Sequence, residues 1–202
     1  KEAALKSMES LAPVLVERVK NDKSTNVRVP AIKALGKLPC GGGGCQALLE
    51  VAKDEKGETR EAALQGIERS AVPDAVGELL KAMAMQEDLA LASAARRGFS
   101  KVRSEAKVSE LVPLLDNPSE SVRLEIVKAL AERKGDAGAA KGIVKALKDS
   151  SKDVRLEAVK AVPVMNLGFD DLGKLEPLIT DQESAVRIAT AEALAARHPL
   201  SA

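Results

Sequence analysis

The sequence predicts an all-α protein, an α-solenoid built from about six stacked helical hairpins. A nine-residue pattern recurs along the chain, first after 27 residues and then after every 31 or 32. Each copy has apolar residues at helical spacing and follows a second amphipathic stretch. Only 1% of the 202 residues are aromatic although 45% are hydrophobic, which favours thin layers of closely packed helices. Repeats of this length are typical of helical repeat arrays.

The recurring pattern is Val-Arg-x-x-Ala-x-x-Ala-Leu, seen most clearly from Val122 and from Val154. With the Arg as position 0, small residues stand at +3 and +6 and apolar residues at −1 and +7, which places them on one face of a helix. This helix is the second of each hairpin and is called helix B. The position 0 residues are Lys1, Arg28, Arg60, Ala92, Arg123, Arg155 and Arg187.

The amphipathic stretch before each copy predicts a first helix, helix A, and a polar turn joins the two. Residues 143–147 form one such stretch, and Ser150 with Asp153 resembles a capping box after it. One hairpin cannot bury its apolar faces alone, but stacked neighbours can. We expect a single repeat domain over residues 1–202, with residues 1–8 as the partial helix of a preceding repeat. The expected hairpins span residues 9–38, 44–70, 74–102, 106–133, 137–164 and 170–197.

The unit resembles a HEAT repeat, in the short HEAT-like or phycobilin-lyase-type form, over nearly the whole chain. The resemblance rests on the Val-Arg pairs of helix B and on an Asp in the turn. It implies a right-handed solenoid, an α–α superhelix, in which turn aspartates and the position 0 arginines form a hydrogen-bonded ladder between repeats. The third hairpin departs from the family pattern, because it has Ala92 at position 0 and no matching turn Asp in residues 85–88. The residues matched to the ladder are Asp22, Asp54, Asp116, Asp149, Asp181, Arg28, Arg60, Arg123, Arg155 and Arg187.

Composition and motifs exclude several classes of protein. A net charge of +1 is not that of a globally basic nucleic-acid binder, and no apolar run is long enough to cross a membrane. No targeting signal is visible, so a cytoplasmic location is the default. The one His, His198, lies near the end of the sequence, and the acidic residues do not pair as a general acid and base. We therefore expect no enzyme, no metal site and no cofactor.

The segment from Cys40 to Cys45 encloses four glycines between the first two hairpins. A plain connecting loop, a redox-sensitive disulfide and half of a metal site are the three interpretations that the sequence leaves open.

Basic residues recur at positions +5 and +9 of helix B, outside the apolar face. If helix B lines the concave side, as the resemblance implies, they form a cationic stripe there. The alternative is a solvated face, because Glu125 and Glu157 each precede a lysine of the stripe by three residues. The candidate partner-binding residues are Lys33, Lys37, Arg69, Arg97, Lys101, Lys128 and Lys160.

The stripe predicts a non-catalytic scaffold or adaptor that binds a protein partner, in particular an acidic segment, within a larger assembly. One alternative is binding of nucleic-acid phosphates on the same face, although no Trp or Tyr is present to stack on bases. A second alternative comes from the resemblance alone: an accessory protein or lyase for a tetrapyrrole chromophore.

Overall fold

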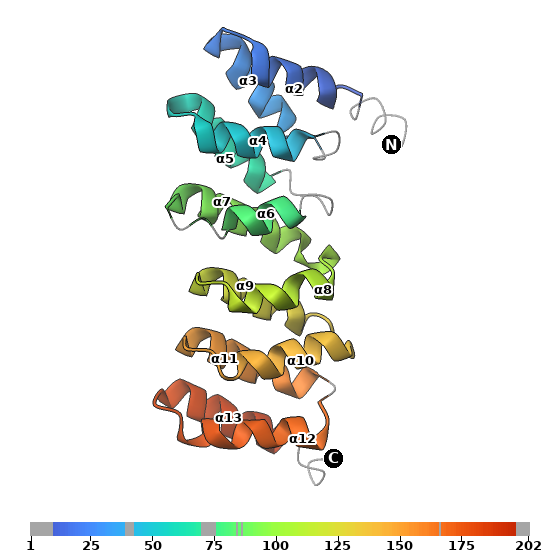
Figure 1. Cartoon of the computed structure of the whole chain (residues 1–202), viewed down its shortest axis with the longest axis vertical. Coiled ribbons are helices and arrows are strands. Elements are labelled where there is room, and N and C mark those ends of the chain that lie inside the picture. Colours follow the sequence, from blue (N-terminus) through green and yellow to red (C-terminus); the bar gives the residue numbers. More distant parts are fainter. Residues whose placement is uncertain are drawn as a thin grey trace. The chain divides into compact units, whose positions relative to one another are not determined.

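The computed structural model describes residues 10–38, 43–69, 76–83, 85, 87–165 and 167–196, apart from the side chains of Phe169 and Asp170. All regular elements in this described part of the chain are helices, and they alternate as the two halves of successive hairpins (Figure 1). The contacts divide the chain into two compact units, residues 1–105 and 106–202. Each unit is a stack of hairpins.

Unit 1 contains three hairpins in its described residues. Helix A of each is α2 (Ala12–Asn21), α4 (Gly44–Asp54) and α6 (Val76–Met83). Helix B of each is α3 (Thr25–Leu35), α5 (Gly57–Arg69) and α7 (Leu89–Val102), and a short 3₁₀ helix, η2 (Arg103–Glu105), follows α7. The helix α5 packs against both α3 and α7, so the helices B form one layer.

Unit 2 repeats the arrangement, and two of its three first helices continue from a short α-helix into a proline-containing 3₁₀ helix. Helix A is α8 (Val108–Leu111) with η3 (Val112–Asp116), then α10 (Ala137–Ala146), then α12 (Phe169–Leu172) with η5 (Gly173–Thr180). Helix B is α9 (Glu120–Ala131), α11 (Lys152–Ala161) with η4 (Val162–Val164), and α13 (Ser184–Ala196). The helix α11 packs against both α9 and α13. Pro113 and Pro163 lie at the starts of 3₁₀ turns, since proline lacks the amide that a continuing α-helix needs.

Polar residues of the turns set the helix starts. The Asp88 carboxylate accepts a hydrogen bond from the Leu91 amide at the start of α7, and the Asp136 carboxylate accepts one from the Ala139 amide at the start of α10. At α11 the capping residue is Ser151, whose hydroxyl accepts from the Asp153 and Val154 amides. The predicted capping box at Ser150 was therefore misplaced by one residue.

The core lies between the two helix layers of each unit and follows the sequence template. The +3 residues Ala63, Ala95 and Ala158 are completely buried. Small residues at +6 let backbones approach closely, and the clearest case is Gly66 of α5, which faces Gly36 at the end of α3. The large side chains between these layers are Ile32, Leu35, Leu48, Ile67, Leu79, Phe99, Ile126, Leu130, Ile143 and Leu147.

Candidate functional site

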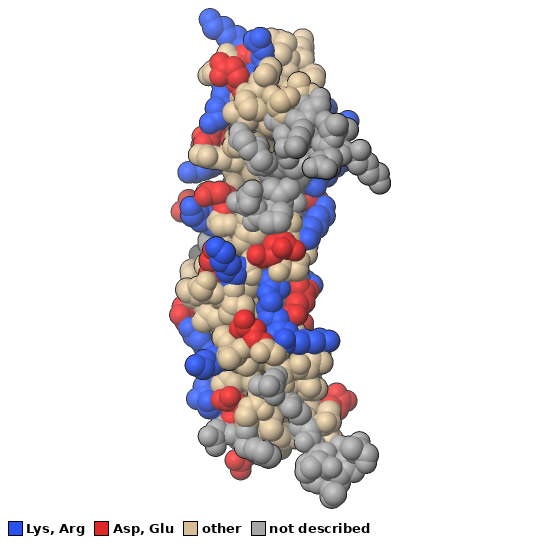
Figure 2. Space-filling view, turned by 90° about the vertical axis from the view of Figure 1, so that its right-hand side faces the viewer, with Lys and Arg blue, Asp and Glu red and all other residues tan. Residues whose placement is uncertain are grey.

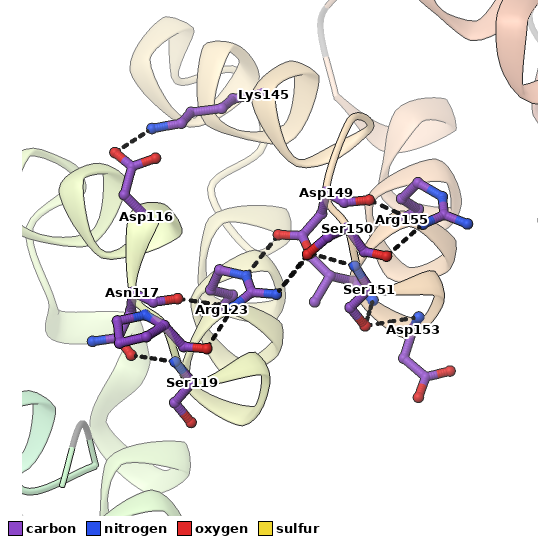
Figure 3. Close-up of polar contacts among 12 residues, drawn as sticks. Asp116, Asn117, Ser119, Arg123, Lys145, Asp149, Ser150, Ser151, Asp153 and Arg155 are labelled. Carbon is purple, nitrogen blue, oxygen red and sulfur yellow. Dashed lines mark hydrogen bonds and ion pairs between the residues drawn. The ribbon is translucent and has the colours of Figure 1, made fainter. Parts of the chain in front are cut away.

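A ladder of arginines joins successive turns in unit 2 (Figure 3). Arg123 of α9 donates from Nε and Nη2 to the two carboxylate oxygens of Asp149, at 2.8 and 2.9 Å, and from Nη1 to the carbonyl of Asn117 at 2.8 Å. Arg155 of α11 binds Asp181 at the same two distances, and its Nη1 donates to the carbonyl of Asp149. Each arginine thus ties its own turn to the turn of the next hairpin.

The ladder lowers the pKa of its carboxylates. Burial on its own would raise the pKa of Asp149, but hydrogen bonds from Arg123 and from the Ser151 amide outweigh it and lower the pKa. For Asp181 the hydrogen bond from Arg155 is the largest influence, and it lowers the pKa despite the burial of the group. Both carboxylates are therefore held in the charged form as structural anchors.

Unit 1 has the same ladder with different acidic residues. Arg28 forms an ion pair with Glu55 while its Nε donates to the carbonyl of Val19. Arg60 donates to both oxygens of Asp88 at 2.5 and 2.6 Å, and its Nε donates to the carbonyl of Ala52. Burial alone would raise the pKa of Asp88, but hydrogen bonds from the Leu91 amide and from Arg60 outweigh it and lower the pKa.

Three residue assignments of the ladder need correction. Glu55, not Asp54, receives Arg28, because the acidic side chain one residue further along the turn reaches the guanidinium. Asn117, not Asp116, holds the turn position, where its side chain accepts from the Ser119 amide. Asp116 is instead bound by Lys145 at 2.6 Å (Figure 3).

The third correction concerns the third hairpin, for which the sequence predicted no turn carboxylate. Asp88 fills that role, because it accepts from Arg60 and also caps α7. The template did not identify Asp88 because the turn before α7 is shorter. Asp88 stands four residues before Ala92, whereas Asp149 stands six residues before Arg155.

Four of the predicted basic residues of helix B contact acidic residues or carbonyls of the protein itself. Lys33 lies 3.5 Å from a carboxylate oxygen of Glu58, and Arg97 lies 2.9 Å from one of Glu68. Lys101 donates to the carbonyl of Glu68 at 2.5 Å. In unit 2, Lys128 lies 3.1 Å from the carboxylate of the buried Glu125. These pairs partly neutralise the predicted stripe.

The other three predicted residues are exposed and make no ion pair among the described residues. Lys37 and Arg69 belong to unit 1 and stand at position +9, just after α3 and at the end of α5. Lys160 belongs to α11 of unit 2.

A second basic surface was not predicted from the sequence. An open groove between α10 and the α12–η5 helix is lined by Lys141, Lys145, Lys148 and Lys174, with Asp171 beside Lys174 at 2.8 Å. The sequence signal was present: residues 141, 145 and 148 lie at i, i+4 and i+7, and residues 137–148 contain no acidic side chain. Figure 2 shows that, on the face it views, lysines and arginines are interspersed with acidic side chains.

The two cysteines and the single histidine, which were considered as reactive or metal-binding residues, do not form a site among the described residues. Cys45 is buried at the start of α4 and belongs to a disulfide bond, so it is not a free thiol. Cys40 and His198 lie outside the described residues. Within the described residues, no three His, Cys, Asp or Glu side chains are grouped as ligands for a metal ion. None of the described helices has the length and apolar character needed to traverse a bilayer.

A family model for HEAT repeats matches the chain twice, at residues 45–131 and 108–195. The chain belongs to the HEAT-repeat family. The predicted resemblance to HEAT repeats is thereby confirmed, and the match covers the hairpins from α4–α5 onward. A search of curated proteins found no match.

Solved structures similar to these HEAT repeats are armadillo-like helical solenoids. A computationally designed armadillo repeat protein for modular peptide recognition is 21% identical, with a TM-score of 0.54, and the match covers 92% of this chain and 99% of that one. A designed armadillo repeat protein in complex with the peptide (KR)4 is 21% identical, with a TM-score of 0.52 and coverages of 93% and 99%. A TOG domain of crescerin is 19% identical, with a TM-score of 0.51 and coverages of 93% and 90%. At these identities the likeness shows the fold alone, and it confirms the predicted all-α solenoid.

Proposed function

We propose that the protein is a non-catalytic scaffold that binds an acidic segment of a protein partner on the helix-B face of unit 1. The helix-B face is the exposed surface of α3, α5 and α7. The observation that carries the proposal is that Lys37 and Arg69 are exposed at equivalent positions of consecutive HEAT repeats, 32 residues apart, without an ion pair in the described residues. Lys101 stands at the same position of the third repeat. An extended acidic segment that crosses successive repeats would meet one cation at each.

The cations that already have partners support this use of the face. The side chains of Lys33 and Arg97 are about half exposed, and that of Glu58 is 67% exposed. Exposed ion pairs of this kind contribute only about 0 to 1 kcal/mol. A carboxylate of the ligand can therefore replace Glu58 or Glu68 as the partner at small cost. The protein's own pairs would then act as replaceable counterions that keep the empty face close to neutral.

A binding function fits the chemistry of the repeats better than catalysis does. Stacked hairpins give a rigid surface on which side chains recur at fixed intervals, and such surfaces select extended ligands. The designed armadillo protein similar in fold carries a basic peptide. The exposed cations of this chain predict the opposite charge in its ligand.

The test is a fluorescence-anisotropy titration with a labelled glutamate-rich peptide. The test variant combines Lys37→Glu with Arg69→Glu, and the control variant combines Lys53→Glu with Lys81→Glu on helices α4 and α6 of the same unit. Both pairs change the net charge equally. We expect the test variant to lose at least tenfold in affinity at moderate salt and the control variant to keep the affinity of the original protein.

Equal losses in both variants would show that the peptide only responds to net charge, and unchanged affinity in both would refute the helix-B face. A labelled duplex DNA serves as the second probe. If duplex DNA bound more tightly than the peptide, with the same dependence on Lys37 and Arg69, nucleic-acid binding would replace the proposed function.

A further inference from the structure

The solvent-facing side of α10 and of the turn that follows it consists of lysines. Between Ala139 and Lys148 the exposed residues are Lys141, Lys145 and Lys148, and all the others are buried. Because these positions are i, i+4 and i+7, the three side chains project from the same face of the helix. They span about 10 Å along the helix axis. We call these three residues the lysine row.

The other first helices do not carry such a row. The α8–η3 helix exposes Glu110 and Asp116 and contains no Lys or Arg. In unit 1, Lys81 of α6 has Glu78 on the same helix at 2.8 Å. In contrast, α10 contains no acidic residue. It lies between two other described hairpins of unit 2 (Figure 1), and neither neighbour covers the row.

Two aspartates approach the lysine row from the neighbouring hairpins. Asp116 lies 2.6 Å from Nζ of Lys145 (Figure 3), and their side chains are 71% and 45% exposed. Asp171 lines the same groove as the row, but it is paired with Lys174 at 2.8 Å. The other two lysines of the row make no ion pair with any described residue. The row therefore presents two cations without a counterion and a third whose counterion is exposed.

The chemistry of the row favours phosphates over carboxylates. The protein binds its own turn carboxylates with arginines, which supply two parallel hydrogen bonds, as Arg123 does to Asp149. A lysine offers instead a hydrated point charge, and an exposed pair with a carboxylate contributes little affinity. A nucleic acid supplies a further source of affinity, because each phosphate that a lysine neutralises releases a condensed counterion.

The spacing and the surroundings of the row fit a duplex. One strand carries a phosphate for about every 3.4 Å of duplex axis, so three lysines within about 10 Å can each contact a different phosphate. The chain has no Trp or Tyr to stack on unpaired bases, which disfavours a single strand. A membrane surface would need exposed apolar side chains among the lysines, but Val144 is only 8% exposed.

We propose that the lysine row of unit 2 binds the phosphate backbone of a double-stranded nucleic acid without reading its base sequence. On binding, Lys145 exchanges Asp116 for a phosphate, and this exchange is easy because the existing pair is exposed. Lys174 adds a fourth cation in the groove beside the row. Contacts to phosphates alone position a duplex but do not specify a sequence. The inference does not rest on the proposed function, which uses the helix-B face of unit 1.

The experiment is a fluorescence-anisotropy titration of a short labelled DNA duplex with the full chain over a series of salt concentrations. For the original protein we expect the logarithm of the association constant to fall against the logarithm of salt concentration with a slope of about −3. The variant Lys141→Gln, Lys145→Gln, Lys148→Gln should bind at least tenfold more weakly at low salt and lose most of this slope. Arginine at the same three positions keeps the charge and should keep the affinity.

A matched control combines Lys20→Gln, Lys53→Gln and Lys81→Gln on helices α2, α4 and α6. It changes the net charge equally and should bind the duplex like the original protein. Circular dichroism and thermal melting verify that all variants are folded. The helix-B variant of Lys37 and Arg69 should also keep its affinity for the duplex, so this test and that of the proposed function can fail separately.

Three outcomes would overturn the proposal. The first is an original protein that does not bind the duplex even at low salt. The second is an equal loss of affinity in the row variant and in the matched control, because the duplex would then respond only to net charge. The third is tighter binding to phosphatidylserine-containing vesicles than to the duplex, with the same dependence on the row, because a membrane surface would then be the partner.

Discussion

Gly36 and Gly66 meet at the closest backbone approach between α3 and α5. A Cβ placed on Gly36 would lie 2.6 Å from the Cα of Gly66, a distance that real Cβ atoms do not reach. Since the atom in the way belongs to the backbone, no side-chain rotation can relieve the clash. The two repeats can stack at this distance only because Gly36 lacks a side chain; a Cβ on Gly66 would lie 3.4 Å from the Gly36 Cα and would press mainly on the Leu48 side chain.

Gly36→Ala should therefore destabilise the protein by about 1–3 kcal/mol, the usual cost of forcing extra volume into a packed contact. Gly77→Ala is the control, since a Cβ on Gly77 within α6 meets nothing within 4 Å. That variant should be neutral or more stable by about 0.5–1 kcal/mol, because alanine favours the helix. Urea unfolding measures both, and equal effects would contradict the close approach.

Asp181→Asn should make the stability less dependent on pH. The folded-state pKa of Asp181 is lowered, first by the hydrogen bond from Arg155. Its contribution is therefore fully present above the unfolded-state pKa of about 3.9 and is lost as the pH falls through the lower folded value. At pH 7 the original protein should be more stable than the variant by about 1–3 kcal/mol, the worth of a hydrogen bond to a charged group. Unfolding curves at pH 7 and pH 3 should show this difference narrowing in acid.

Arg123→Gln and Lys145→Gln should differ in cost, although each removes one cation from unit 2. Arg123 binds Asp149 with side chains that are 11% and 8% exposed, so its removal leaves a poorly solvated carboxylate. We expect a loss of about 3–5 kcal/mol. Lys145 and Asp116 are 45% and 71% exposed, and breaking that pair should cost less than about 1 kcal/mol. Thermal melting of both variants under one buffer condition gives the comparison.

Ala161→Leu should cost about 1–3 kcal/mol by overpacking. Ala161 stands at position +6 of α11 and is 4% exposed, so additional side-chain atoms have no free space there. Chemical denaturation checks the effect. An unchanged midpoint would remove position +6 from the core of the repeat.

Arg97→Glu should leave folding almost unchanged. Arg97 is 51% exposed and its pair with Glu68 is open to solvent, so the expected change is within about 1 kcal/mol. The same variant should weaken binding of a glutamate-rich peptide if that residue contributes to the helix-B face. A large drop in the melting temperature would instead give Arg97 a structural role.

Four of the five predicted ladder arginines bind a carboxylate of the next turn, but the sequence assigned some of their partners to the wrong residue. Asp149 and Asp181 were identified because their repeats keep the spacing of the template. Asp54 was assigned in place of Glu55 because a turn can shift its side chains by one residue without disturbing the helices that flank it. Asp116 was assigned in place of Asn117 because the template specified an Asp, although Asn117 keeps the six-residue spacing to Arg123. Asp88 was missed because its turn is shorter. Helical periodicity determines faces of helices, but it carries no information about the path of a turn.

For the basic stripe, the sequence predicted which cations are exposed but not which of them form ion pairs. The repeat pattern predicted exposed cations at +5 and +9 of helix B, and Lys33, Lys37, Arg69, Arg97 and Lys160 are exposed. It did not predict that Glu58 and Glu68 approach Lys33 and Arg97 from the neighbouring repeat. Such pairs join residues about 25 to 29 positions apart in sequence. Their existence depends on the exact stacking of two hairpins, which local spacing does not encode.

By itself the sequence determined the class of fold. Every repeat has small and apolar side chains at the same helical positions, and these can be buried only when the hairpins stack on one another. It also determined that the ladder arginines stand at position 0 of helix B, as Arg28, Arg60, Arg123 and Arg155 do. Only the tertiary structure decided which carboxylates those arginines bind and which surface cations are neutralised. Those properties depend on distances of a few ångströms between atoms of different repeats, and such distances are set by packing.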